Sequence, residues 1–306
     1  MFRFLATFVA WSIVFASLSS QAGVPKTVTF VGYNVENWLP TDRQVDGKWV
    51  DRAEKPEAEK AAVVRILARL QPDIIGLVEM GDRTQLADLQ NRLRAAGIDL
   101  PHSEWLEALD TERHVALLSR FPMTSRQSQD RVMFDVNGQP QGMHRGILDV
   151  TIAVTPQYEL RVLGVHFKSR RPVPEFDQAA LRLREAEALK ARMDAILETS
   201  PDANVLIFGD FNDTKNEPPM KLLLADARKR GGFKDLWLKD SLGDRWTHFW
   251  RAADQYARLD YLIVSPGLWP DVIREKSGID RSKEWGDASD HRAVFTVFTP
   301  RERIHP

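Results

Sequence analysis

The sequence contains no cysteine among its 306 residues. This absence excludes disulfide bonds, thiolate metal sites and a cysteine nucleophile, so the fold must be held together by burial alone. Any bound metal ion must therefore be held by Asp, Glu, Asn or His. A convincing Ser-His-Asp arrangement is also lacking, and this argues against a covalent serine mechanism.

An excess of charge of one sign is lacking as well. The sequence contains 42 Lys and Arg residues and 43 Asp and Glu residues, which gives a formal net charge of −1. Proteins that bind long nucleic acids without sequence preference usually carry a basic surplus, because neutralising phosphates supplies most of their affinity. The composition excludes such a broad basic surface, so any contact with a nucleic acid must be local.

Long apolar runs are missing except at the start of the chain. One uncharged apolar run spans residues 5–18, and the small residues Ser20 and Ala22 follow it. A basic start, an apolar stretch of about 15 residues and small residues at such positions match a cleavable secretory signal, whereas a membrane anchor needs about 20 apolar residues. We therefore expect a signal peptide over residues 1–22. The mature protein would then comprise residues 23–306, without a stable membrane span, in the periplasm or outside the cell.

Segments rich in Val, Ile and Phe alternate with amphipathic segments, and this alternation favours an α/β or α+β fold. We expect strands at residues 28–33, 74–78, 115–119, 147–154, 160–167, 204–208, 259–264 and 293–299. We expect helices at residues 55–70, 84–96 and 174–198, a turn at Asn137-Gly138, and a loop over residues 239–256. The mature chain has no internal repeat, low-complexity tract or flexible linker, so a single domain is the simplest interpretation.

Polar side chains lie at the ends of several predicted strands. They are Asn34, Glu79, His166, Asp210, Asn212, Asp290 and His291. Folds of this class place their sites where strands end at the edge of a sheet. Singly, each has a simpler explanation, since Asn34 is a good turn residue and a lone His166 is more often a satisfied core histidine. Glu79 is the strongest single signal, because carboxylates are almost never buried unless they are paired or bind a metal.

Seven motifs that carry these residues follow one another in a recognisable order. They are YNVEN at 33–37, IIGLVEM at 74–80, ALLSRFPM at 116–123, VHFKS at 165–169, IFGDFND at 207–213, RLDYLIV at 258–264 and SDHRAV at 289–294. Together they resemble the endonuclease/exonuclease/phosphatase superfamily, which is DNase I-like, and in particular its exported bacterial nuclease-like members. GDFN, RLDY and SDH in that order are specific, although each alone is weak. Ala293 departs from the proline common there, which affects a strand entry rather than a reacting atom.

The resemblance implies a four-layer α/β sandwich, in which two central, mostly antiparallel β-sheets are flanked by helices. It also implies a metal site with Glu79 as the principal Mg²⁺ ligand and with Asn34 and Asp290 close by. Such an all-oxygen set suits Mg²⁺, which prefers oxygen ligands and retains several waters. Mn²⁺ and Ca²⁺ are the alternative ions.

The resemblance further implies a division of catalytic roles. Asp210 would orient or deprotonate the attacking water, and Asn212 would donate to the phosphate oxygens. His291 would stabilise charge on the phosphorus or position the nucleophile, while Asp260 would accept its other ring N–H and fix its tautomer. His166 would hydrogen-bond the phosphate from the opposite side. Hydrolysis of an anionic ester needs such a set, because a cation and several donors must gather negative charge in the transition state.

Two basic residues near these motifs are further candidates for substrate binding. Lys168 follows His166 closely and Arg145 precedes a strand, so they predict a small basic rim that would bind the substrate together with Asn212. Ordinary solvated charge explains them equally well.

The leading functional hypothesis is a monomeric, secreted or periplasmic nuclease or phosphodiesterase that depends on Mg²⁺ and acts on a phosphate ester, including nucleic acid. A second is a phosphomonoesterase or lipid phosphodiesterase of the inositol-phosphate or sphingomyelin type, which the near-neutral charge favours. A sphingomyelinase should show an exposed apolar hairpin, and the sequence offers no clear candidate. A third is a catalytically silent binding domain, which should have lost Glu79, Asp210 or His291, but all three are present.

Overall fold

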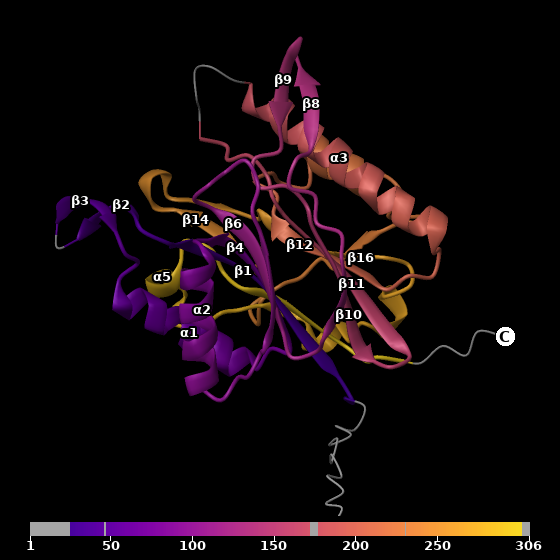
Figure 1. Cartoon of the computed structure of the whole chain (residues 1–306), viewed down its shortest axis with the longest axis horizontal. Helices are drawn as coiled ribbons and strands as arrows, with labels where there is room; N and C mark the ends of the chain where they lie inside the picture. The colour runs from indigo at the N-terminus through magenta and orange to yellow at the C-terminus, as the bar shows by residue number, and fades with distance from the viewer. Residues whose placement is uncertain (1–24, 46, 172–176, 230, 302–306) are drawn as a thin grey trace, which may run out of the picture.

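The computed structural model describes residues 25–45, 47–171, 177–229 and 231–301, and the expected signal peptide at 1–22 lies outside them. Two six-stranded sheets pack face to face in the middle of the molecule, and helices cover their outer faces (Figure 1). Among the described residues, no helix is long and apolar enough to cross a membrane.

The first sheet has the strand order β17-β18-β1-β4-β6-β5. Its strands are β17 (Gly278–Ile279), β18 (Val294–Phe298), β1 (Val28–Trp38), β4 (Ile74–Met80), β6 (His114–Ser119) and β5 (His102–Leu106). Only the central pair β1 and β4 is parallel, and the other neighbours are antiparallel. The carboxyl ends of β1 and β4 therefore lie at the same edge of the sheet.

The second sheet has the order β13-β16-β12-β11-β10-β7. Its strands are β13 (Lys234–Asp235), β16 (Asp260–Val264), β12 (Val205–Asp210), β11 (Tyr158–His166), β10 (Leu148–Thr155) and β7 (Met123–Arg126). Here the parallel pair is β11 and β12, in a register that sets His166 opposite Asp210. The antiparallel pairing of β12 with β16 sets Asp260 on the other side of Asp210.

Between the sheets lies an apolar core to which both contribute, including Phe30 and Ile74 from the first sheet and Phe208 from the second. The ring of Phe208 occupies space that side chains at Gly76 and Gly164 would fill, since a Cβ atom at either glycine would overlap it. These two glycines therefore leave room for the aromatic ring of Phe208 in the core between the sheets.

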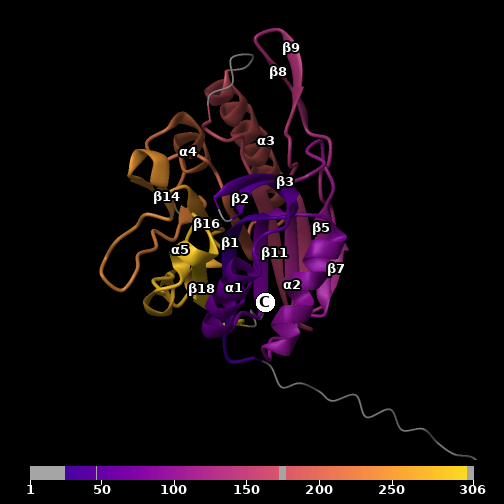
Figure 2. The same ribbon diagram turned by 90° about the vertical axis from the view of Figure 1, so that its left-hand side faces the viewer.

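Helices cover the outer face of each sheet. The helices α1 (Glu57–Leu70) and α2 (Arg83–Ala95) pack on the first sheet, with a short helix α5 (Trp285–Ala288) beside α1, whereas α3 (Gln178–Thr199) and α4 (Pro218–Leu223) pack on the second. Seen from the side, α1 and α2 lie apart from α3 and α4 (Figure 2). The α/β fold with two mostly antiparallel sheets between helices is therefore confirmed.

Every predicted strand is present, although β1 runs on to Trp38, five residues beyond the prediction. The predicted helices correspond to α1, α2 and α3, and residues 174–176 of the third lie outside the described residues. The turn at Asn137-Gly138 is confirmed, because both residues have positive φ and join the hairpin of β8 (Met133–Val136) and β9 (Gln139–Gly142).

The expected loop over residues 239–256 is partly wrong. It contains β14 (His248–Trp250) and the one-turn helix η1 (Arg251–Ala253), and β14 pairs with β15 (Gln255–Ala257). Strands of three residues leave too short a pattern to be recognised. A second unpredicted hairpin joins β2 (Thr41–Val45) to β3 (Lys48–Ala53) and projects from the body (Figure 1). It carries Trp49 and Val50, whose exposed fractions are 71% and 42%.

Candidate active site

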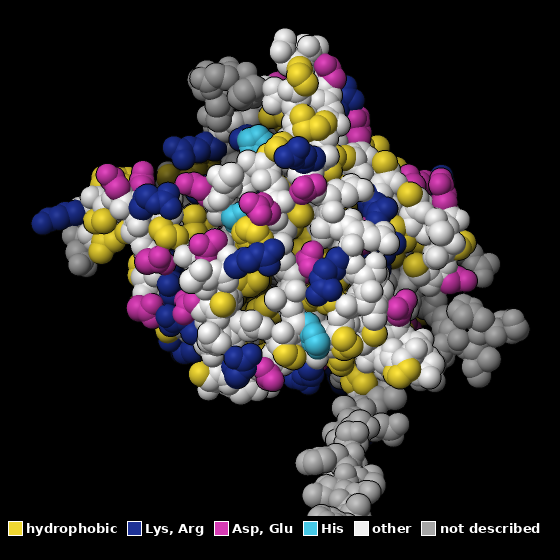
Figure 3. Space-filling view, in the orientation of Figure 1, with side chains coloured by type: hydrophobic (Ala, Val, Ile, Leu, Met, Phe, Trp, Pro, Cys, Tyr) yellow, Lys and Arg dark blue, Asp and Glu magenta, His cyan; other side chains and the backbone are white. Residues whose placement is uncertain are grey.

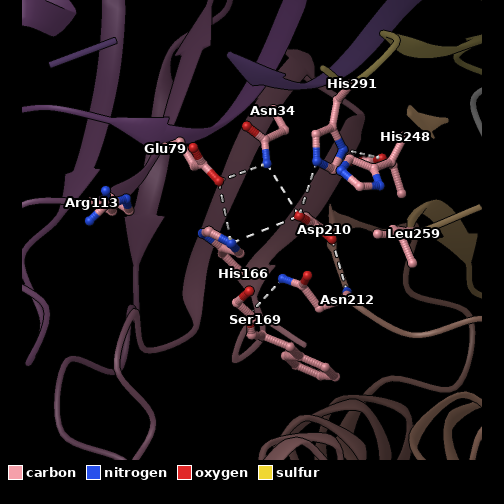
Figure 4. A network of polar contacts seen from close by, with 12 residues as sticks. Asn34, Glu79, Arg113, His166, Ser169, Asp210, Asn212, His248, Leu259 and His291 are labelled. Carbon is pink, nitrogen blue, oxygen red and sulfur yellow. Dashed lines mark hydrogen bonds and ion pairs between the residues drawn. The ribbon is translucent and has the colours of Figure 1, made fainter. Parts of the chain in front are cut away.

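The polar residues predicted from strand ends meet where the two sheets adjoin. Asn34 of β1 and Glu79 of β4 come from the first sheet, and His166 of β11 and Asp210 of β12 come from the second (Figure 4). His291, which lies just before β18, points into the same cluster. The site is therefore shared between the sheets, and neither sheet alone contains it.

Asn34 links the two central carboxylates. Its Nδ2 donates to Glu79 Oε1 at 3.1 Å and to Asp210 Oδ2 at 3.2 Å. Its Oδ1 accepts the backbone N–H of Glu36 at 3.0 Å, which fixes the orientation of the amide. The nitrogen, and not the oxygen, thus faces the carboxylates. In this arrangement Asn34 holds Glu79 and Asp210 in place, and its role as a metal ligand stays a prediction.

Glu79 is held by an unusual backbone conformation. Its φ of +61° lies in the left-handed region, as do those of Glu36 at +45° and Asn37 at +55°. Residues other than glycine adopt such angles at a cost and keep them only where the surrounding structure enforces them, often at functional sites. The N–H of Asn37 donates to Glu79 Oε2 at 3.0 Å, so the strained segment after β1 fixes the carboxylate.

His291 lies between carboxylates. Its Nδ1 is 2.7 Å from Asp260 Oδ2 and its Nε2 is 3.6 Å from Asp210 Oδ2. Burial lowers the pKa of His291, but Asp260, Asp210 and Asp290 outweigh it and hold that pKa well above its ordinary value. The neighbouring carboxylates therefore favour the imidazolium form of His291, in which both ring nitrogens carry N–H donors.

The pKa of Asp210 is also shifted by its surroundings. Burial raises its pKa to about 7, and Asp260 and Glu79 add to the effect, while His291 opposes it. The backbone N–H of Asn212 donates to its Oδ1 at 2.9 Å. A carboxylate with a pKa near the operating pH accepts and releases a proton readily, which is what a general base requires.

His166 and Asn212 flank Asp210 on the second sheet. The Nε2 of His166 is 3.9 Å from Glu79 Oε1 and 3.8 Å from Asp210 Oδ2, too far for direct hydrogen bonds. Burial, together with Arg145, holds the pKa of His166 well below its ordinary value, so its ring is neutral. Asn212 donates through Nδ2 to the carbonyl oxygen of Phe167 at 3.0 Å, and the amide's second N–H is left for another acceptor.

Of the two predicted substrate-binding cations, Arg145 is buried and does not lie on an exposed rim. One Nη of its guanidinium pairs with Asp110 Oδ2 at 2.9 Å. Its Nε and other Nη are buried without a hydrogen-bond partner in the described part of the chain, as is Nδ1 of His166. Burial and the charge of Arg145 lower the pKa of Lys168. Unpaired buried donors are costly, so this group of cations is suited to an anion.

Asp290 connects the cluster to two residues that sequence reasoning missed. Its backbone N–H donates to Glu36 Oε2 at 2.9 Å, and its Oδ2 is 3.7 Å from His248 Nε2. The ring of His248 lies 4.6 Å from that of His291 between centroids. Glu36 follows Asn34 by two positions in YNVEN, and this strand spacing was a usable signal. His248 gave no signal because β14 was not expected.

The donor set fits a hard divalent cation. Three groups of side chains offer ligand atoms that lie within 4.8 Å of one another. They are Glu79 with His166 and Asp210, Asp210 with Asp260 and His291, and His248 with Asp290 and His291. A protonated His291 offers no ligand atom, so the first group is the one compatible with the pKa of that ring. Burial and the nearby Asp290 raise the pKa of Glu36 to about 7, a sign of crowded negative charge. Carboxylate oxygens are the ligands that Mg²⁺ and similar ions prefer, so a cation would relieve this repulsion.

Several solved structures have the same fold. Truncated TDP2 from Caenorhabditis elegans superposes with a TM-score of 0.61 at 18% identity, over 89% of this chain and 98% of that one. The human Nocturnin catalytic domain with bound sulfate anion gives 0.63 at 15%, over 90% and 94%. An endonuclease/exonuclease/phosphatase from Bacteroides vulgatus gives 0.60 at 16%, over 90% and 100%. At these identities the likeness establishes the fold, which is DNase I-like.

No curated protein sequence matches the chain at a significant level. The model of the Endonuclease/Exonuclease/phosphatase family, in contrast, matches residues 45–291, most of the chain. That span includes Glu79, Asp210 and His291, which the structure brings into one cluster. The chain therefore belongs to the Endonuclease/Exonuclease/phosphatase family.

Proposed function

We propose that the protein is a metal-dependent phosphodiesterase that cleaves phosphodiester bonds with an activated water, and that its substrates are nucleic acids or nucleotide esters. One observation carries this proposal. The pKa of Asp210 is raised to about 7 while that of His291 is held well above its ordinary value, and the two side chains lie 3.6 Å apart beside Glu79. In-line attack on an anionic ester requires a general base for the water and an N–H donor for the phosphate oxygens, and Asp210 and His291 would supply them at one centre.

Each residue has a role that follows from its position. Asp210 accepts a proton from the attacking water and orients it. His291 donates N–H to the phosphate oxygens, on which negative charge builds up, and Asp260 keeps its ring charged and aligned. A divalent cation held by Glu79 and Asp290 would neutralise charge on the phosphate. The unpaired donors of Arg145 lie on the His166 side and suit the remaining phosphate oxygens.

The surface favours short substrates over long duplexes. On the face shown in Figure 3, Lys and Arg side chains are interspersed with Asp and Glu, in keeping with the net charge of −1. Binding along an extended polyanion depends on a continuous basic surface. We therefore propose oligonucleotides or nucleotide diesters, bound by local contacts near the centre.

A second candidate function has one observation in its favour. The hairpin of β2 and β3 exposes Trp49 and Val50, although the sequence offered no clear apolar hairpin. Exposed aromatic and aliphatic side chains on a projecting hairpin are one feature of phosphodiesterases that act on membrane lipids, although most other side chains of this hairpin are polar or charged. This function would use the same centre and would require Trp49 for activity on vesicles.

The test is a substrate panel with purified residues 23–306. It comprises single- and double-stranded DNA, RNA, bis-p-nitrophenyl phosphate, p-nitrophenyl phosphate, inositol phosphates and sphingomyelin vesicles, each with Mg²⁺, Mn²⁺, Ca²⁺ or EDTA. We expect metal-dependent cleavage of diesters that falls by at least about 100-fold in Asp210→Asn, the order lost when a general base is removed. The exposed Glu198→Gln on α3 is the matched control and should keep wild-type activity.

Three outcomes would overturn the leading proposal. Activity on monoesters alone would make the protein a phosphatase, and full activity in EDTA would remove the metal from the mechanism. Selective cleavage of sphingomyelin that is lost in Trp49→Ala would establish the lipid function instead.

We also propose that the protein acts outside the cytoplasm. The support is the sequence of residues 1–22, which lie outside the described structure. N-terminal sequencing of protein recovered from the periplasm or medium should read Gly23 first, whereas an intact Met1 on soluble cytoplasmic protein would refute export.

A further inference from the structure

A pocket of about 530 Å³ opens beside the proposed catalytic centre, and none of the roles above uses it. Asp290 and Glu36 line it on the side of the centre. Its other walls come from α1, from the β14–η1 segment and from α5, and they include Arg65, Trp250 and Gly286. Pockets of about 300–1,000 Å³ are typical of small-ligand sites, so this one has room for a group of nucleoside size.

One wall of the pocket is aromatic and is tied to the centre. The ring of Phe249 stacks on Tyr256 with centroids 4.4 Å apart and an interplanar angle of 21°. The backbone N–H of Phe249 donates to the carbonyl oxygen of Asp290 at 2.9 Å, which fixes this wall relative to the cluster. Trp250, the next residue, also lines the pocket, and 54% of its surface is exposed. An exposed indole on a rigid support is a surface on which a planar ring can stack.

The charges around the pocket are mixed. Arg65 and Arg251 line it, and Arg251 donates through one Nη to the carbonyl oxygen of Gly286 at 2.5 Å, which joins η1 to α5. The carboxylates of Glu59 and Asp287 line it as well, and with Glu36 and Asp290 they outnumber the two guanidinium groups. Guanidinium groups suit a phosphate, and carboxylates accept hydrogen bonds from amino or hydroxyl groups. A lining with this many charges is unsuited to an aliphatic lipid chain.

We propose that this pocket binds the nucleoside unit next to the phosphate that is cleaved, with the base against Trp250 and the flanking phosphate near Arg65 and Arg251. The proposal rests on the phosphodiesterase function and names the part of the substrate that gives it specificity. Because Asp290 lines both the pocket and the catalytic cluster, a group in the pocket is placed directly beside the reacting phosphate.

The experiment compares four chromogenic diesters that differ only in the group offered to the pocket. They are thymidine 5′-(p-nitrophenyl phosphate), thymidine 3′-(p-nitrophenyl phosphate), methyl p-nitrophenyl phosphate and p-nitrophenylphosphorylcholine. We expect Trp250→Ala to lower kcat/KM for at least one thymidine ester by about 5- to 100-fold, the range that loss of base stacking produces. Methyl p-nitrophenyl phosphate, which offers the pocket no ring, should change by less than about twofold. Arg251→Gln should leave these thymidine esters unchanged, because neither carries a flanking phosphate. It should raise KM for the 3′-phosphorylated form of thymidine 5′-(p-nitrophenyl phosphate).

Two matched controls separate a specific effect from general damage. Trp237→Ala removes another exposed tryptophan, one that lies against Lys215, Arg245 and Arg258 and does not line the pocket. Arg94→Gln removes an exposed arginine from α2. Both should leave all four substrates unchanged. Equal losses on all four diesters in Trp250→Ala, or none, would overturn the proposal, and a loss confined to the choline ester would assign the pocket to a quaternary ammonium group instead.

A binding measurement keeps this proposal distinct from the proposed function. Thymidine 5′-monophosphate should bind the wild-type protein in calorimetry, and Trp250→Ala should weaken that binding by at least about fivefold. If no diester is hydrolysed but this difference persists, the catalytic function fails and the pocket stands. If diesters are hydrolysed but the nucleotide binds both proteins equally, the pocket proposal fails alone.

Discussion

The carboxylate of Asp260 lies 2.7 Å from Nδ1 of His291, while Asp210 lies 3.6 Å from Nε2 of the same ring. The imidazole ring of His291 therefore lies between the carboxylates of Asp260 and Asp210. The backbone N–H of Asp260 donates to Thr247 Oγ1 at 3.0 Å, which fixes the backbone that carries the Asp260 carboxylate. In the proposed mechanism, Asp260 is a positioning residue that acts on the substrate through His291.

Replacing Asp260 by asparagine should lower kcat and change its pH dependence. Loss of one charge-assisted hydrogen bond costs about 1.5–3 kcal/mol, which corresponds to about 10- to 100-fold in rate. Asp260 raises the pKa of His291, so its removal lowers that pKa. The pH above which kcat declines, where the imidazolium loses its proton, should therefore move to lower values. The pH–rate profile with bis-p-nitrophenyl phosphate measures this shift.

The exposed Asp202→Asn serves as the control for that measurement and should leave the profile unchanged. A variant at Asp260 that lost activity equally at every pH would show that the residue only supports the fold.

A second prediction concerns the stability of the protein as pH rises. Glu185 of α3 is buried, and its Oε2 accepts the backbone N–H of Lys168 at 2.7 Å. Burial raises its pKa to about 7, against the effects of Arg145 and Arg182. The folded protein therefore holds this proton more tightly than the unfolded chain does. The stability linked to it is present below about pH 4.5 and is lost as pH rises to about 7.

Glu185→Gln should remove this pH dependence, because glutamine keeps an acceptor for the Lys168 N–H and carries no charge. The variant should be more stable than wild type above pH 7, by up to about 3 kcal/mol, and similar to it near pH 4.5. Urea unfolding at both pH values measures the difference. A variant that is less stable at pH 8 would show that the charge is favourable where it lies.

A third prediction tests the packing between the sheets. A methyl group at Gly164 would lie 2.6 Å from Phe208 Cε1 and 2.9 Å from Val115 Cγ1. Gly164→Ala should therefore lower the free energy of unfolding by about 1–3 kcal/mol, the usual cost of overpacking a core. Gly231→Ala, with nothing within 4 Å of its added methyl, is the control and should be close to neutral.

The double variant Gly164→Ala with Phe208→Leu should recover part of that loss relative to Phe208→Leu alone, because the smaller side chain makes room for the methyl group. Strict additivity of the two changes in urea unfolding would mean that the ring and the glycine do not oppose each other.

The long buried strands were predictable because their apolar runs are bounded by polar or turn residues, as at Ile74–Met80 and Val205–Asp210. The arrangement of those strands in two sheets came from the resemblance and not from periodicity, since a buried strand does not reveal its neighbours. The hairpin of β2 and β3 was missed because its two strands pair only with each other and carry exposed charges.

Much of the cluster was predictable because chemically useful residues followed apolar strands. What the sequence could not provide was orientation. The amino-acid sequence did not indicate that the side-chain nitrogen of Asn34 would face Glu79, or that Arg145 would be buried instead of lining an exposed rim. Both depend on long-range packing, as does the approach of His248 to Asp290 from a strand of three residues.

The division of the cluster between two sheets has a mechanical consequence. Glu79 moves with one sheet and His166 with the other, so their separation of 3.9 Å reports the spacing between the layers. Hydrostatic pressure or gentle heating that shifts the layers by a fraction of an ångström would misalign these proposed catalytic groups while every strand stayed paired. Activity would then be lost before the far-UV circular dichroism spectrum changes. Turnover would therefore report the packing between the two sheets more sensitively than the secondary-structure signal does.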